Sequence, residues 1–161
     1  MGSVTAIFIA PAAQAPMEEI TTAELEAGRG IVGDRYHAGA GTWSKAGEEH
    51  LNRRHVTLIE AEAVEAVARD YGVPVDARIT RRNIVTRGVA LNHLVGMEFT
   101  VGSVRLRGVK LCEPCGHLER LAGLPIRQPL VHRGGLNCEV LETGRVEVGD
   151  LVDAPVRLPV R

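Results

Sequence analysis

Apolar and polar residues alternate through most of the stretch from residue 97 to residue 111, and this pattern constrains the fold more than any other feature. Met97, Phe99 and Val101 share one face of a strand, and the alternation continues at residues 104 and 106 and again at 109 and 111. The phase slips at Gly108, which predicts a β-bulge. The stretch therefore predicts two strands, the second of them bent.

Further short strands are expected along the chain. Residues 4–10 form an apolar run ended by Pro11, residues 136–140 alternate in phase, and Val146 and Val148 follow a turn at Gly144. With 18 glycines punctuating these strands, the sequence favours a mainly β fold with appended helices. A closed or partly open β-barrel is expected, because closure removes exposed strand edges.

One clear helix is predicted from about Glu60 to Tyr71. Its apolar stripe consists of Val64, Val67, Ala68 and Tyr71, and Gly72 would end it. The glycine- and charge-rich segment 38–52, which contains the only tryptophan, Trp43, is expected to be a mobile surface loop.

Composition sets outer limits on the function. The 161 residues, 45% of them hydrophobic, predict a single domain spanning residues 1–161. The balance of 19 basic and 20 acidic residues speaks against a nucleic-acid partner. The apolar run at residues 4–10 is too short to span a membrane. Three cysteines, an odd number, favour free thiols and a cytoplasmic location.

Cys115 is the strongest candidate for a functional residue. It follows Pro114 and precedes Leu118, Leu121 and Ala122, which recur at helical spacing. The thiol would therefore lie at a helix N-terminus, where free N–H groups and the helix dipole stabilise a thiolate. Such a thiolate can ligate a metal or accept sulfur.

The Cys112-x-x-Cys115 spacing leaves two alternatives open, a structural zinc half-site and a dithiol redox motif. Zinc requires four ligands, and only Cys138, His117 or His132 could complete the set at irregular spacing. A thioredoxin-like motif is expected beside a parallel sheet, whereas these strands indicate antiparallel pairing. Cys138 shares the phase of its apolar neighbours, which predicts a core position.

Three polar stretches could bind an anion. The first, residues 30–37, presents Arg35 and His37 after a glycine turn; the second, residues 81–88, has several guanidiniums; the third is the glycine turn at residues 132–135. Guanidinium groups and glycine-rich turns suit phosphate. An ordinary turn, a solvated strand face and a hairpin are the respective alternatives.

Taken together and in order, these stretches resemble the MOSC domain, the family named for the C-terminal domain of molybdenum cofactor sulfurases. The resemblance covers residues 30–150 and is greatest to small stand-alone bacterial members. It rests on Gly33-Asp34-Arg35 with His37, on residues 82–89, on Leu94-x-Gly96-x-x-Phe99-x-x-Gly102, on Pro114-Cys115, and on His132 to Gly135 followed by Val146-x-x-Gly149-Asp150.

The resemblance implies a MOSC-type β-barrel and a molybdenum cofactor, molybdopterin, whose phosphate the basic residues would hold. The candidate cofactor-binding residues that it implies are Arg35, His37, Arg82, Asn83, Thr86, Arg87, His132 and Arg133. Cys115 matches the cysteine that ligates molybdenum in reductase-type relatives and that is assigned a persulfide in sulfurase-type relatives. A pyridoxal phosphate domain is not expected in this chain. A separate cysteine desulfurase, an electron-donor protein or a molybdoenzyme acceptor would then be a partner.

Two functional hypotheses follow from the resemblance. In the first, the protein binds the molybdenum cofactor or carries sulfur for it through the Cys115 thiolate. In the second, it is a molybdenum-dependent reductase of N-hydroxylated compounds that uses an external electron donor, and Cys115 ligates the metal. Whether the chain is an oxidoreductase, a sulfur transferase or no enzyme is left open at this stage.

Overall fold

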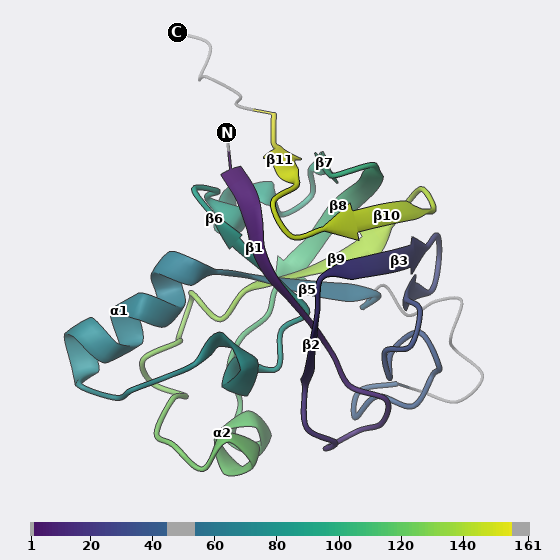
Figure 1. Cartoon of the computed structure of the whole chain (residues 1–161). Helices are drawn as coiled ribbons and strands as arrows, with labels where there is room; N and C mark the ends of the chain where they lie inside the picture. Colours follow the sequence, from purple (N-terminus) through teal and green to yellow (C-terminus); the bar gives the residue numbers. More distant parts are fainter. Residues whose placement is uncertain (1, 45–53, 156–161) are drawn as a thin grey trace, which may run out of the picture.

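Seven strands close into a barrel within the part of the chain that the computed structural model describes, residues 2–44 and 54–155 (Figure 1). The described residues form eleven strands. In chain order they are β1 (Gly2–Ile9), β2 (Glu18–Ile20), β3 (Thr22–Glu26), β4 (Gly30–Ile31), β5 (Val56–Glu60), β6 (Ile84–Arg87), β7 (Glu98–Val101), β8 (Val104–Leu111), β9 (Leu136–Val140), β10 (Gly144–Glu147) and β11 (Leu151–Asp153). Of these, β2, β3, β4 and β10 are not part of the closed barrel. The helices are α1 (Ala61–Tyr71) and α2 (Gly116–Ala122), with 3₁₀ turns η1 (Ala77–Thr80) and η2 (Leu91–Leu94).

The barrel follows the order β1-β6-β5-β9-β8-β7-β11 and closes where β11 returns to β1. Gly2 pairs with Val152 and Ser3 with Leu151 at this closure. All of the pairings are antiparallel except that between β5 and β6. The expected mainly β barrel with appended helices is confirmed, and it is closed. A smaller sheet, in the order β10-β3-β4, lies beside it (Figure 1).

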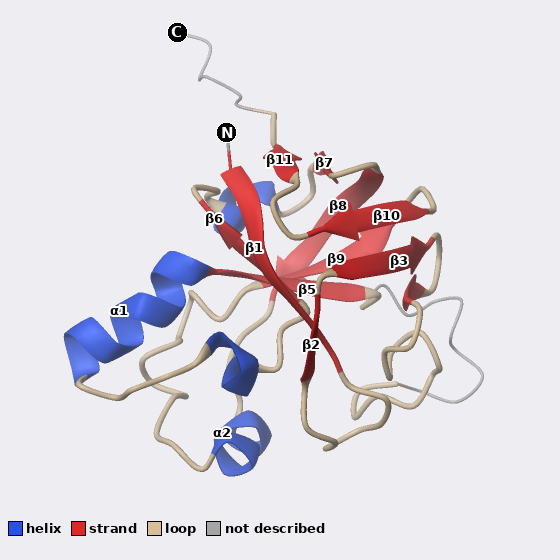
Figure 2. Ribbon diagram, in the orientation of Figure 1, coloured by secondary structure: helices blue, strands red, loops and turns tan. Residues whose placement is uncertain are grey.

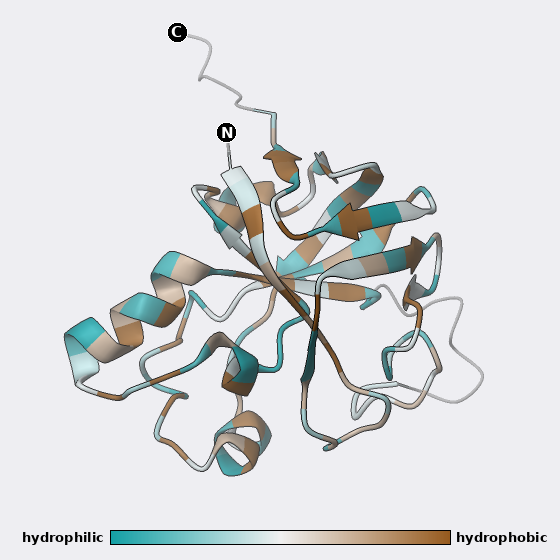
Figure 3. Ribbon diagram, in the orientation of Figure 1, coloured by the Kyte–Doolittle hydropathy of each residue, from teal (hydrophilic) through white to brown (hydrophobic). Residues whose placement is uncertain are grey.

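Alternate residues of the barrel strands fill its interior, which explains the brown and teal banding of the strands in Figure 3. Ile7, Leu58, Leu106 and Leu136 are fully buried in this core. The predicted bulge is confirmed, because the register between β8 and β9 shifts between Gly108 and Lys110. A Cβ at Gly108 would overlap the carbonyl oxygen of Leu94, so this position requires glycine.

The helices gather on one side of the barrel (Figure 2). Helix α1 packs on β5 and β6 and buries Val64 and Val67 in a second apolar cluster, which includes residues of the α2 region. Gly72 ends α1 in the left-handed conformation, with φ of 68°, as predicted. The predicted stripe was wrong at its C-terminal end, because Ala68 is exposed and Tyr71 is 51% exposed.

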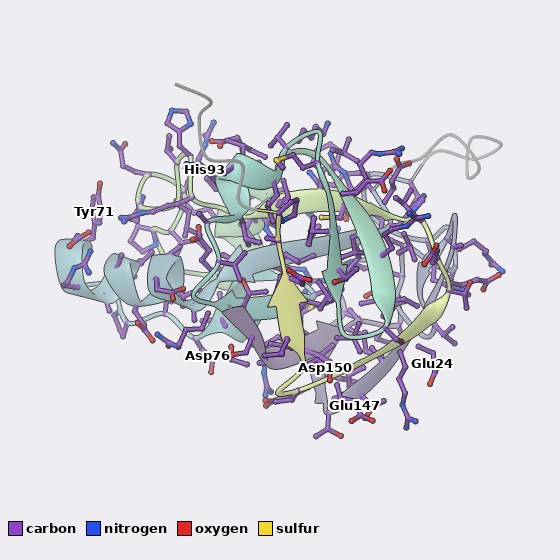
Figure 4. All side chains as sticks on the ribbon, turned by 90° about the horizontal axis from the view of Figure 1, so that it is seen from above. Glu24, Tyr71, Asp76, His93, Glu147 and Asp150 are labelled. Atoms are coloured by element: carbon purple, nitrogen blue, oxygen red, sulfur yellow. The ribbon has the colours of Figure 1, made fainter. Side chains whose placement is uncertain are left out.

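Figure 4 shows Tyr71 standing away from the molecule at the far end of α1. Ala61, Ala63 and Ala66 complete the buried face instead. The helix thus turns its small residues to the barrel, an arrangement that a stripe chosen by size alone does not reveal.

The remaining sequence predictions concern Val148 and the loop that contains Trp43. Strand β10 ends before Val148, which is 43% exposed. Of the expected surface loop, Trp43 is 53% exposed, whereas residues 45–53 lie outside the described part. No helix within residues 2–44 and 54–155 has the length and apolar character needed to cross a membrane.

Candidate functional site

A cavity of about 380 Å³ opens where the end of β8 and helix α2 meet the segments that precede β5 and β6. It is lined by Arg35, Tyr36, Thr42, Trp43, Arg54, Thr57, Arg81, Arg82, Lys110, Leu111, Cys112, Glu113, Cys115, His117, Leu118, Leu121 and Asn137. The barrel supplies its rigid floor, and α2 supplies one wall. A volume in this range suits a small organic ligand.

Cys115 lies in this cavity at the start of α2, as predicted. The buried Pro114 precedes it, and Cys115 is the N-cap residue, with an extended backbone at φ of −133° and ψ of 169°. Its carbonyl oxygen accepts a hydrogen bond from the Glu119 N–H at 3.1 Å, but its side chain makes no capping bond. The half-buried thiol is therefore not committed to holding the helix.

The other two cysteines have different surroundings. Cys138 is fully buried in the barrel core, as predicted. Burial raises the pKa of the Cys138 thiol well above its usual range, and the neighbouring Cys112 adds to this effect. Cys112 is 8% exposed and lines the cavity, and its backbone N–H donates to the Gly135 carbonyl at 2.7 Å.

Neither alternative for the Cys112-x-x-Cys115 pair gains support from the structure. All three cysteines are free thiols. Over residues 2–44 and 54–155, no group of three or more histidine, cysteine, aspartate or glutamate side chains converges on a possible metal site. The strands that lead to and from this pair, β8 and β9, are antiparallel.

Arg82 joins the cavity to the loop that carries the cysteines. Its side chain is 8% exposed. Nε donates to the Gly134 carbonyl at 2.7 Å and Nη2 donates to the Cys112 carbonyl at 3.1 Å. The residue thus lines the cavity and also fixes the backbone immediately before Cys115.

Asn83, which directly precedes β6, is buried and does not line the cavity. Its Oδ1 accepts from the Thr57 N–H at 3.1 Å, and its Nδ2 donates to the Phe8 carbonyl at 3.1 Å. These contacts tie β1, β5 and β6 together. The structure therefore gives Asn83 a role in holding the barrel end that faces the cavity.

Arg35 lines the cavity as one half of a buried ion pair. Its Nη1 lies 3.0 Å from Asp34 Oδ1, and its guanidinium stacks 4.8 Å from the centroid of the Tyr36 ring. Asp34 Oδ1 also accepts from the Ala10 N–H at 3.1 Å. His37 points elsewhere: Nε2 lies 2.7 Å from Glu26 Oε2, a contact that lowers the pKa of Glu26.

Four further predicted residues do not line the cavity. Thr86 is buried within β6, and Arg87 pairs with Glu65 of helix α1 on the outer surface. The side chain of His132 is 81% exposed and lies near Glu113. Arg133 donates to the Pro129 carbonyl at 2.7 Å and lies 3.5 Å from an oxygen of Asp70.

The glycines that follow Arg133 have a packing explanation. A Cβ at Gly134 would collide with the Cys112 carbonyl oxygen, and one at Gly135 would collide with that of Leu58. Gly135 also has φ of 114°, which disfavours other residues. The two glycines therefore allow other parts of the protein backbone to pass close to this turn.

Three cavity residues that are not among the candidate cofactor-binding residues carry buried polar atoms with no hydrogen-bond partner among the described residues. These atoms are Arg81 Nη2, His117 Nε2 and Asn137 Oδ1. Unpaired buried polar atoms are rare and costly, and groups that serve to bind a ligand are one class of them. Asn137 was detectable in the sequence, since it alternates with core-facing Leu136 and Cys138.

Arg81 is held in an unusual conformation. Its backbone is left-handed at φ of 61°, and Nη1 donates to the Ala15 carbonyl at 2.7 Å. Burial, together with the nearby charge of Arg35, lowers the pKa of Arg81. The buried Nη2 is therefore a fixed donor in a partly dehydrated, cationic site.

The comparisons with known proteins agree with this fold. The MOSC domain model matches residues 33–153. The crystal structure of YuaD from Bacillus subtilis superimposes with a TM-score of 0.75 at 20% identity, over 94% of each chain. YiiM from Geobacillus stearothermophilus gives a TM-score of 0.70 at 14% identity, over 95% of this chain and 74% of that one.

YiiM from Escherichia coli is also similar, with a TM-score of 0.66 at 16% identity, over 97% of this chain and 71% of that chain. No curated protein gives a significant match to the sequence. At these identities the solved structures establish the fold, while the family model, which spans most of the chain, establishes the family. The chain belongs to the MOSC domain family.

Proposed function

We propose that the cavity binds a molybdenum-containing pterin cofactor and that the Cys115 sulfur contacts the metal end of that cofactor. The observation that carries the proposal is the convergence of a free thiol with three unpaired polar atoms, Arg81 Nη2, His117 Nε2 and Asn137 Oδ1. A ligand with a metal that accepts a thiolate, an anionic tail and a polar heterocycle would satisfy all of these groups.

The donor set fits such a cofactor. A thiolate is a soft ligand, and it suits a metal whose other ligands include sulfur. The cavity is also cationic, because Arg81, Arg82 and Lys110 line it without a carboxylate partner in the described parts of the chain. Guanidinium donors are the usual partners of phosphate groups.

Each cavity residue would make a different contribution to binding the cofactor. Cys115 provides the sulfur, Arg81 donates to an anionic oxygen, and Asn137 accepts a hydrogen bond through Oδ1. Leu118 and Leu121 supply apolar surface that limits access of water to the thiol. When bound, the cofactor would supply the redox and sulfur chemistry of molybdenum.

Arg82 supports the site from behind. Because it bonds the Cys112 and Gly134 carbonyls, it fixes the loop that aims Cys115 into the cavity. A barrel floor and a locked loop preorganise the thiol.

The test is a measurement of molybdenum and pterin in protein expressed in a host that makes the cofactor. The native chain is expected to contain close to one molybdenum per chain, and Cys115→Ser is expected to lose most of it. Cys138→Ala, which removes a core thiol, is the matched control and should retain the metal. Native-level molybdenum in Cys115→Ser, or none in the native chain, would contradict cofactor binding through this sulfur.

Intact mass measurement of the same samples distinguishes the sulfur-carrier alternative. A native chain that lacks molybdenum but gains the mass of one sulfur atom at Cys115 would indicate persulfide carriage. That result would replace metal ligation with sulfur transfer while keeping Cys115 as the functional group.

A further inference from the structure

Two arginines lie near Gly116, the residue that follows Cys115, and neither guanidinium has a carboxylate partner in the described residues; they stand outside the residues that line the cavity. Arg120 lies on α2, and Arg127 lies in the segment that follows the helix; both are exposed. A Cβ added to Gly116 would lie 3.5 Å from Arg120 Nη1 and 3.9 Å from Arg127 Nη1. The two guanidiniums therefore converge over Gly116, the residue next to the thiol.

This arrangement differs from that of the arginines elsewhere on the described surface. Arg29, Arg69, Arg78, Arg87, Arg105, Arg107, Arg133 and Arg145 each have a carboxylate oxygen within 4.0 Å. For Arg120 and Arg127, no carboxylate partner exists among residues 2–44 and 54–155. The nearest acid in the helix, Glu119, uses Oε2 to accept the backbone N–H of Arg127 at 2.9 Å.

Two unneutralised guanidiniums at close range repel each other, and an anion between them removes this cost. Gly116 has no side chain to fill the space between them. We infer that Arg120 and Arg127 form a subsite for a carboxylate or phosphate group of a small molecule that reacts at Cys115. The inference rests on the proposed function only in taking Cys115 as the reacting centre, and it assigns anionic compounds as the preferred substrate class.

The test uses two alkylating reagents that differ in charge, iodoacetate and iodoacetamide, on the protein without cofactor. In both reactions the Cys115 thiolate forms a C–S bond, the C–I bond breaks and iodide leaves. Peptide mass spectrometry gives the rate at Cys115 separately from those at Cys112 and Cys138. The ratio of the iodoacetate rate to the iodoacetamide rate reports the attraction of a carboxylate to the thiol, independently of thiolate content.

The ratio is expected to fall by about three- to tenfold in the Arg120→Gln/Arg127→Gln double variant, and the difference should shrink at high salt. Arg69→Gln, whose guanidinium pairs with Asp70, is the surface control and should leave the ratio unchanged.

An unchanged ratio in the double variant would overturn the subsite, as would an equal fall in Arg69→Gln. The iodoacetamide rate also monitors folding, because a variant that unfolds would expose Cys115 to both reagents. Since the assay contains no molybdenum, its outcome is separate from that of the metal measurement. A charge effect without metal binding would leave the subsite standing while the proposed cofactor fails.

Discussion

Arg82 holds the backbone of Cys112 in place, with Nη2 donating to its carbonyl oxygen at 3.1 Å while Nε bonds Gly134. One buried guanidinium thereby joins the start of β6 to the two loops that flank the cavity. The position of Cys115, three residues after Cys112, depends on this contact. The stability of the fold and the geometry of the site are coupled at this point.

Replacing Arg82 by Met is expected to lower the free energy of unfolding by about 2–4 kcal/mol, because two buried carbonyl groups lose a charged donor. Urea unfolding followed by circular dichroism measures the change. Arg69→Gln, an exposed residue paired with Asp70, is the control and should change stability by less than about 1 kcal/mol. A loss of similar size in both variants would show that Arg82 does not lock the loop.

The Arg81→Gly variant tests the contribution of Arg81 to anion binding separately from its contribution to the stability of the fold. Glycine adopts the left-handed conformation at φ of 61° without the penalty of about 1–2 kcal/mol that other residues incur. This gain would offset the lost bond to the Ala15 carbonyl, so the free energy of unfolding should change little. The dissociation constant for inorganic phosphate is expected to rise by about tenfold, since a charged hydrogen bond is lost.

Calorimetric titration with phosphate measures this change. Arg78→Gln is the matched control, because Arg78 lies in the adjacent turn η1 and pairs with Glu19. Unchanged phosphate affinity in Arg81→Gly would remove Arg81 from the site. A large loss of stability would instead assign it a structural role.

The buried thiol of Cys138 predicts a specific dependence of stability on pH. Burial raises its pKa in the folded state, so the folded chain keeps the proton that the unfolded chain releases. Its contribution is fully present below the pKa of an unfolded cysteine, about 8.5. It is lost as the pH rises from there toward the higher pKa of the folded thiol, with a slope of at most about 1.4 kcal/mol per pH unit.

Urea unfolding at a series of pH values from neutral to alkaline tests this linkage. The native chain should lose stability faster than Cys138→Ala above the pKa of a free thiol. Parallel curves for the native chain and Cys138→Ala would show that Cys138 does not titrate as burial requires.

Local pattern predicted those elements whose cause is local. The phase slip at Gly108 predicted the bulge. Gly72 predicted the end of α1, and Pro114 predicted that α2 begins shortly after it. Glycine and proline act on the conformation of their own backbone, so their effects can be predicted from local sequence. Barrel closure by β1 and β11 brings together residues nearly 150 positions apart. The alternation of side chains gives the face of a strand but not its partner.

The candidate site was predicted less completely for a related reason. A buried structural arginine, such as Arg82, and a ligand-binding one look alike in sequence, and so do the buried amides Asn83 and Asn137. What separates them is which hydrogen-bond partners the fold brings near. Asn83 Oδ1 accepts from the Thr57 N–H and its Nδ2 donates to the Phe8 carbonyl, whereas Asn137 Oδ1 has no donor in the described residues. Arg87 likewise meets Glu65 only because α1 packs beside β6.

The most direct test of the central proposal is X-ray absorption at the molybdenum edge, recorded on protein purified from a host that makes the cofactor. The native chain is expected to show one thiolate sulfur ligand in addition to those of the pterin. Any metal that Cys115→Ser retains through its arginine contacts is expected to lack this ligand. An identical metal environment in the native chain and Cys115→Ser would contradict the account.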